Sequence, residues 1–120
     1  MKYILLIHQG DSPTPRDPAA WEKLSKDEQK AVFADYQAVN QTPGVTPGLQ
    51  LDEPEAATTV RVKDGKPLTT DGPFTEAKEA LGGWLVFEAD DQDAAIELAA
   101  RIPAARLGGA IEVRPIVENQ

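Results

Sequence analysis

The stretch DGPFTEAKEALGG, residues 71–83, joins two patterned parts of this chain. It combines an Asp-Gly-Pro turn, one aromatic residue, four charged groups and two further glycines. Asp bonds nearby backbone in turns, Gly adopts positive φ and Pro fixes its own φ, so the stretch is expected to begin with a turn. Such a constrained connection is typical of a loop that carries function on a rigid scaffold.

The residues before this stretch predict a β-hairpin. Residues 57–63 alternate between a polar set that includes Arg61 and an apolar set that includes Val60 and Val62. Asp64-Gly65 is a tight-turn signal, and residues 66–70 predict a short return strand. We expect the valine side of this hairpin to face the core, and the polar side to face solvent or a pocket.

The remaining elements follow from hydrophobic periodicity and capping signals. Ser25-Lys26-Asp27-Glu28 has the form of a capping box, and Asp90-Asp91 offers a second N-cap. Val45 to Leu51 is a weak strand pattern, interrupted by Pro47-Gly48. The predicted elements are strands over residues 3–7, 45–51, 83–89 and 110–117, a helical turn over 18–24, and helices over 26–40 and 94–102.

Without the hairpin, this order is βαββαβ, the ferredoxin-like arrangement of an antiparallel sheet with two helices on one face. We therefore predict an α+β fold with an inserted hairpin. The other sheet face would lack cover, and an apolar face of this kind is commonly buried by a second copy. A homodimer through the open sheet face is the expected assembly.

Length and composition limit the functional classes. The 120 residues are expected to form one domain over residues 1–120. The formal net charge of −8 argues against nucleic-acid binding, which depends on Lys and Arg. The absence of cysteine fits a reducing cytoplasm, and no stretch approaches the length of a membrane span. The apolar start, residues 1–8, is expected to be a strand rather than a signal peptide.

Residues 71–79, DGPFTEAKE, closely resemble the signature of the DGPF (DGPFAETKE) proteins, which belong with the YCII-related proteins. The similarity continues through residues 1–7, 59–67, 82–84, 100–106 and 111–115, so it spans essentially the whole chain. The resemblance implies a ferredoxin-like, dimeric α/β-barrel fold. It implies little about chemistry, although some such proteins are considered regulators because their genes lie near those of alternative sigma factors.

YCII relatives carry a proposed His–Asp pair, with the histidine on the first helix. Here the only histidine is His8, at the end of the first strand, so that pair does not transfer directly. Our candidate catalytic residues are Asp71 and His8. Asp71 would act as an acid or base if desolvated, or would only close the turn. His8 would carry protons at neutral pH, or would be a hydrogen-bonded structural residue.

The candidate ligand-binding residues surround this pair. Phe74 would be a ligand platform or a core residue, and Lys78 and Glu79 would frame a pocket mouth, pair across a dimer or lie in solvent. Arg61 and Arg114 would bind an anionic ligand, or would form salt bridges. We expect no metal and no cofactor, because one histidine with scattered carboxylates makes a poor metal site and no nucleotide-binding motif is visible.

Two functional hypotheses remain open at this point. The first is a small cofactor-independent enzyme or small-molecule binder with a cleft at the DGPF stretch. The second is a non-enzymatic regulatory or protein-interaction module linked to transcription. A convergent pocket would favour the first hypothesis, and an exposed interaction patch would favour the second.

Overall fold

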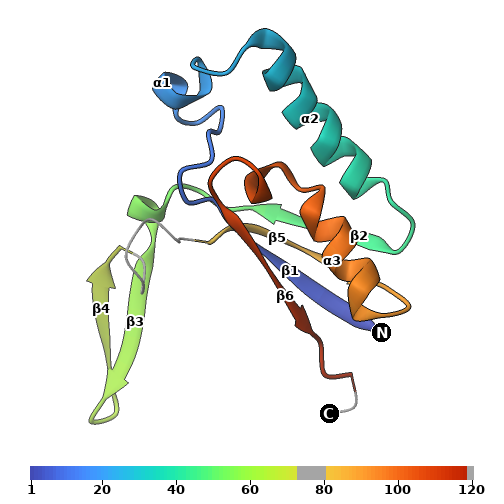
Figure 1. Cartoon of the computed structure of the whole chain (residues 1–120). Coiled ribbons are helices and arrows are strands. Elements are labelled where there is room, and N and C mark those ends of the chain that lie inside the picture. The colour runs from blue at the N-terminus through green and yellow to red at the C-terminus, as the bar shows by residue number, and fades with distance from the viewer. Residues whose placement is uncertain (73–80, 119–120) are drawn as a thin grey trace.

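The chain folds around a four-stranded antiparallel sheet with two main helices on one side (Figure 1). The structure, a computed structural model, describes residues 1–72 and 81–118. The elements in chain order are β1 (Lys2–His8), α1 (Pro18–Trp21), α2 (Lys26–Asn40), β2 (Val45–Gln50), η1 (Pro54–Ala56), β3 (Thr58–Lys63), β4 (Lys66–Asp71), β5 (Leu81–Glu88), α3 (Gln92–Ala100), η3 (Pro103–Ala105) and β6 (Ala110–Pro115).

The four-stranded sheet has the strand order β2-β5-β1-β6, and all neighbours are antiparallel. Leu5 of β1 lies opposite Leu85 of β5 and Val113 of β6, which places β1 inside the sheet. The helices α2 and α3 connect its strands as in a βαββαβ unit. The predicted α+β class is confirmed, and the topology is compatible with a ferredoxin-like fold.

The core lies between this sheet and the helices. Tyr3, Leu5 and Ile7 are buried, because alternate side chains of β1 point toward the helical side. The intervening Ile4 and Leu6 are only half-buried. The continuous apolar run of the first strand therefore supplies one set of core residues and one set on the opposite sheet face.

The capping box fixes the start of α2. The Ser25 hydroxyl oxygen accepts from the Glu28 backbone N–H at 3.1 Å, and the Glu28 carboxylate accepts from the Ser25 backbone N–H at 3.0 Å. This reciprocal pair satisfies two free helical donors, so α2 has the predicted bounds. The helical turn before it is shorter than predicted, since α1 ends at Trp21.

Two strands, β3 and β4, form a separate two-stranded sheet that stands apart from the main sheet (Figure 1). The expectation that its valines face the core is wrong, because Val60 is 59% and Val62 is 71% exposed. Alternation distinguishes the two sides of a strand pair, but it does not say which side another element covers. The tight turn adopts positive φ at Asp64 and Gly65.

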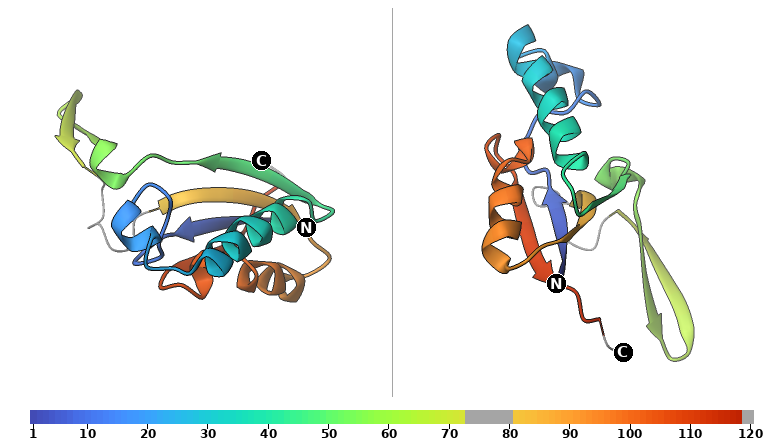
Figure 2. Two further views of the ribbon diagram at one scale, coloured as in Figure 1. Left: turned by 90° about the horizontal axis from the view of Figure 1, so that it is seen from above. Right: turned by 90° about the vertical axis from the view of Figure 1, so that its right-hand side faces the viewer.

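Figure 2 shows the position of this hairpin relative to the helices. In both views the hairpin projects on the side of the main sheet that lies away from α3. Among the described residues, no helix is long and apolar enough to cross a membrane.

Candidate functional site

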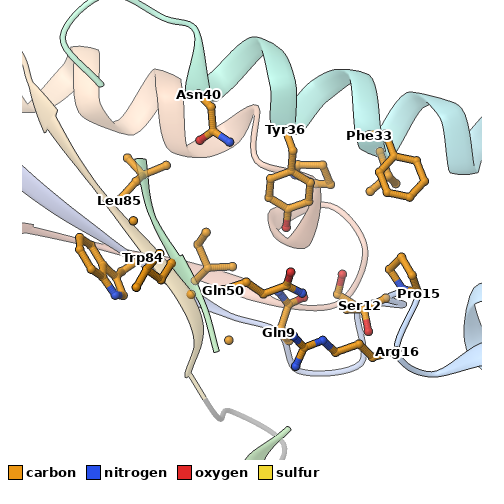
Figure 3. A pocket seen from close by; sticks show the side chains of 18 of the residues that line it. Gln9, Ser12, Pro15, Arg16, Phe33, Tyr36, Asn40, Gln50, Trp84 and Leu85 are labelled. Atoms are coloured by element: carbon orange, nitrogen blue, oxygen red, sulfur yellow. The ribbon is translucent and has the colours of Figure 1, made fainter. Parts of the chain in front are cut away.

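A cavity of about 440 Å³ lies between α2 and one end of the main sheet (Figure 3). Its walls combine aromatic and aliphatic side chains with a small group of amides, a hydroxyl and a guanidinium. The residues that line it are Ile7, Gln9, Ser12, Pro13, Thr14, Pro15, Arg16, Val32, Phe33, Tyr36, Asn40, Gly48, Leu49, Gln50, Gly82, Gly83, Trp84, Leu85 and Pro103.

The loop after β1 forms one wall, and hydrogen bonds hold it in place. The Arg16 guanidinium donates to the Leu51 carbonyl at 3.2 Å and to the Asp52 carboxylate at 3.0 Å. The Ser12 backbone N–H donates to the Gln9 carbonyl at 2.8 Å. These contacts tie the loop to the end of β2, so Arg16 reaches the cavity from a fixed position.

Gln9 connects the sheet to the helix across this cavity. A Cβ atom at Gly82 would collide with the Gln9 side chain, so the glycine makes room for the amide. The Gln9 side chain also hydrogen-bonds the Tyr36 hydroxyl. The Gln9 Oε1 atom is buried and has no hydrogen-bond partner among the described residues. Gln9 therefore packs against β5 and bonds α2 at the polar end of the cavity.

Tyr36 brings a hydroxyl group to the same region. Figure 3 shows its ring extending from α2 toward the side chains of Gln9 and Gln50. Burial raises the pKa of Tyr36, and this effect exceeds the opposing hydrogen bonds from Gln9 and from the Ala104 backbone. The hydroxyl is therefore protonated at neutral pH and available as a hydrogen-bond donor.

The residues of this cavity favour binding over proton transfer. Arg16 and Tyr36 are the ionisable groups among the described residues that line it. Arginine stays protonated at physiological pH, and Tyr36 keeps its proton because burial raises the pKa of its hydroxyl group. The cavity can therefore hold a molecule with an apolar body and hydrogen-bonding groups, but these two side chains do not exchange protons near pH 7.

A smaller cavity of about 180 Å³ adjoins the first. The two cavities share Gln9, Ser12, Thr14, Arg16, Gln50 and Gly82. The other residues that line the smaller cavity are Gly10, Asp17, Leu51, Asp52, Glu53, Pro54, Glu55 and Leu81. Carboxylates border this second cavity, so the two spaces differ in charge on either side of Arg16.

His8 and Arg114, two of the predicted site residues, lie close together where β1 pairs with β6. The His8 Nε2 atom lies 3.4 Å from a Glu112 carboxylate oxygen, and Arg114 also pairs with Glu112. The Arg114 hydrogen bond lowers the pKa of Glu112, with a smaller contribution from His8. His8 and Arg114 thus share one carboxylate, as the salt-bridge interpretation of Arg114 expects.

The other predicted residues lie on the hairpin or outside the described residues. Asp71 ends β4 opposite Thr58, and Arg61 lies opposite Leu68, so Asp71 and Arg61 are on different sides of the hairpin. Phe74, Lys78 and Glu79 are outside the described residues.

None of the four described candidates lines either of the two cavities. These four are His8, Asp71, Arg61 and Arg114. A joint acid–base role for Asp71 and His8 stays a prediction. The described residues also contain no cluster of three or more His, Cys, Asp or Glu side chains arranged to hold a metal ion.

Sequence reasoning missed the residues of the larger cavity. Gln9 and Arg16 lie between the strand predicted over residues 3–7 and the helical turn predicted over 18–24, and Tyr36 lies within the helix predicted over 26–40. One signal was present, because Tyr36 and Asn40 place polar groups four residues apart on one face of that helix. The convergence itself depends on how the loop folds back against the end of β2.

The chain is a small α+β protein with a cavity between one helix and its main sheet. The family model for the YCII-related domain matches residues 1–120, so the chain belongs to the YCII-related family. An uncharacterised protein of Rhizobium meliloti (strain 1021) is 32% identical over 121 residues, covering 97% of this chain and 92% of that relative.

Proposed function

We propose that this YCII-related protein binds a small molecule in the cavity between α2 and the sheet. The observation that carries the proposal is the convergence of Gln9, Arg16 and Tyr36 on an otherwise largely apolar space of about 440 Å³. Ligand sites commonly have this size and this combination of apolar walls with a few polar groups. No cofactor is invoked in this proposal.

The position of the cavity connects it to the DGPF stretch. Gly82 and Gly83 line it, and they are the last two residues of the stretch 71–83. The ligand we propose has a flat, mostly apolar body that contacts Phe33, and a carbonyl or carboxylate oxygen that accepts from Arg16 or Tyr36. The proposed cavity thus lies next to the DGPF stretch, as expected, but its polar side chains, Gln9, Arg16 and Tyr36, come from other parts of the chain.

A nuclear magnetic resonance screen of aromatic carboxylates, carboxamides and alcohols tests this proposal. We expect binders whose amide shift changes map to residues around Gln9, Tyr36 and Gly83. Arg16→Gln should weaken the carboxylates more than the alcohols, because it removes the charge and keeps an amide donor. An absence of binders, or shift changes confined to other regions, would overturn the proposal.

The enzymatic version needs a proton-transfer group in addition to this cavity. We propose Asp71 and His8 as that pair, supported by the turn chemistry of residues 71–73. Because neither side chain lines the two cavities, the ligand would extend beyond them to reach this pair. Asp71→Asn and His8→Asn should then abolish turnover of a ligand found in the screen while leaving its affinity within a few-fold. Unchanged turnover in both variants would contradict the catalytic role.

We further propose a homodimer that packs through the open sheet face as a dimeric α/β-barrel. Ile4 and Leu6 of β1 lie on this face, and each is half-buried rather than enclosed by the helices. A second copy on this face would bury them, which is the common solution for an apolar sheet with one covered side. A cytoplasmic location is proposed on the absence of cysteine.

Sedimentation equilibrium tests the dimer. We expect the wild-type protein to be dimeric at micromolar concentration and Leu6→Glu to be monomeric, because the new carboxylate would be buried without a partner. Gln92→Glu, at the exposed start of α3 and away from the open sheet face, is the control for one added negative charge. A wild-type monomer at high concentration would contradict the dimer.

The regulatory alternative has one supporting observation, the exposed apolar side of the β3–β4 hairpin. A protein-interaction module would use such a surface for a partner. A specific partner recovered from the native host, and lost when Val60 and Val62 are made polar, would support this function. A protein that keeps its partner in that variant would contradict it.

A further inference from the structure

We propose that the β3–β4 hairpin, residues 58–71, is an arm that packs its valine side on a second copy of this chain. This hairpin arm would add a contact to the homodimer proposed above, and the inference rests on that dimer. It assigns a partner to a surface that the sheet-to-sheet contact alone does not cover.

The valine side of the hairpin arm is exposed, with Val60 and Val62 along it and the polar pair Thr58 and Asp71 at its base. Val60 pairs across the strands with Thr69, and Val62 pairs with Pro67, so these four side chains share one side of the hairpin. Val60 is 59% and Val62 is 71% exposed. An isolated two-stranded hairpin is marginally stable in water, and a flat apolar hairpin tends to pair with another surface. A partner that covers the valines would stabilise the hairpin and would remove this apolar surface from water.

Hydrogen bonds hold the base of the hairpin arm. The Thr59 hydroxyl donates to the Gly72 carbonyl at 2.8 Å, and the Gly72 backbone N–H donates to the Ala57 carbonyl at 2.7 Å. The Ala57 backbone N–H in turn donates to the Pro54 carbonyl at 3.0 Å, which closes the η1 turn. These bonds join the two ends of the hairpin arm to each other and to η1.

The direction in which the hairpin arm projects favours a second copy as the partner that covers its valine side. The hairpin arm projects on the side of the main sheet away from α3 (Figure 2), which is the side of the open sheet face. A second copy seated on that face would lie within the space that the hairpin arm borders. In a two-fold dimer the same contact forms twice, because each hairpin arm meets the other copy.

Charge complementarity supports the same occupant. The hairpin arm carries three cations and two carboxylates, while the rest of the chain carries nine cations and eighteen carboxylates. Lys63 and Lys66 lie opposite each other beside the tip. Arg61, Lys63 and Lys66 lie on the side opposite the valines, so these cations flank the valine contact and are not part of it. The arm has one more cation than carboxylates, and this excess attracts it at long range to the acidic body of another copy.

The test compares two polar substitutions on opposite sides of the hairpin arm. The double variant Val60→Thr with Val62→Thr removes apolar surface and keeps β-branched residues that suit strands. Leu68→Thr is the matched control, because Leu68 is 49% exposed on the other side of the same hairpin. Sedimentation equilibrium measures the dimer dissociation constant of each protein.

We expect the double variant to weaken the dimer by about 10- to 100-fold, and Leu68→Thr to leave it within about threefold. Nuclear Overhauser contacts between the Val60 or Val62 methyl groups of a labelled copy and an unlabelled copy should be present in the wild-type dimer. A dimer unchanged in the double variant, without such contacts, overturns the arm contact and leaves the sheet-face dimer intact. A monomeric wild-type protein overturns both proposals.

Discussion

The main sheet and the hairpin arm use similar strand sequences in opposite ways. In β1 the alternate residues Tyr3, Leu5 and Ile7 are buried beneath helices, whereas Val60 and Val62 of β3 lie in solvent. Both strands have the β-branched or aliphatic composition that suits a sheet. The difference comes from what packs on each strand, so a strand pattern predicts a surface that requires cover and does not identify the cover.

The largest expected difference between these regions is in stability. Leu5→Ala should lower the free energy of unfolding by about 3 kcal/mol, because it leaves a cavity in the core. Val62→Ala should change the stability of the monomer by no more than about 0.5 kcal/mol. Urea denaturation at a concentration well below the dimer dissociation constant measures both. Similar losses in the two variants would show that the hairpin arm packs on its own chain.

Gly82 and Gly83, two adjacent glycines of β5, are expected to differ in how much they matter for the stability of the main sheet. Gly82→Ala should destabilise the protein by about 1 to 3 kcal/mol, because the new Cβ atom displaces the Gln9 side chain from its contact with Tyr36. Gly83→Ala is the matched control, since its Cβ atom would have neighbours no closer than 3.6 Å. Thermal unfolding measures both variants, and equal effects would contradict the bridging role of Gln9.

The capping box of α2 should contribute less. Ser25→Ala removes the hydroxyl that accepts from Glu28, and it should cost about 1 kcal/mol of stability. Ser25→Asp should restore most of that loss, because aspartate caps helices equally well. Chemical denaturation distinguishes the two variants. An alanine variant as stable as the wild type would show that α2 depends on packing alone.

The smallest expected effect is in the acid range. The Arg114 hydrogen bond lowers the folded-state pKa of Glu112 below its ordinary value of 4.5, so the pair stabilises the fold above that pH. Stability should fall as the pH decreases below 4.5, and the fall should be less steep in Glu112→Gln. Glu22→Gln, an exposed carboxylate on another element, is the control. Identical acid slopes for the wild type and Glu112→Gln would contradict this pairing.

The sequence predicted local structure well where local interactions decide it. The bounds of α2 follow from a capping box whose two bonds lie within four residues, and both bonds are present. The alternation in β3 identified two sides of a strand, but the burial of its valines was predicted wrongly. Burial depends on which element lies across from the strand, and that information is not local.

The candidate site was less accessible to sequence reasoning. Gln9, Arg16 and Tyr36 come from a strand end, a loop and a helix, and tertiary packing brings them to one cavity. Isolated signals such as a histidine or an Asp-Gly turn are visible in a sequence, whereas convergence of neutral amides is not. The predictions for Phe74, Lys78 and Glu79 lie outside the described residues.

The difference between the two regions is tested most directly by amide hydrogen exchange measured over a range of protein concentrations. We expect amides of the hairpin arm to gain protection as the dimer forms, while those at the centre of β1 and β5 are protected at every concentration. Protection in residues 58–71 that does not change with concentration would contradict the claim that this hairpin depends on a second copy.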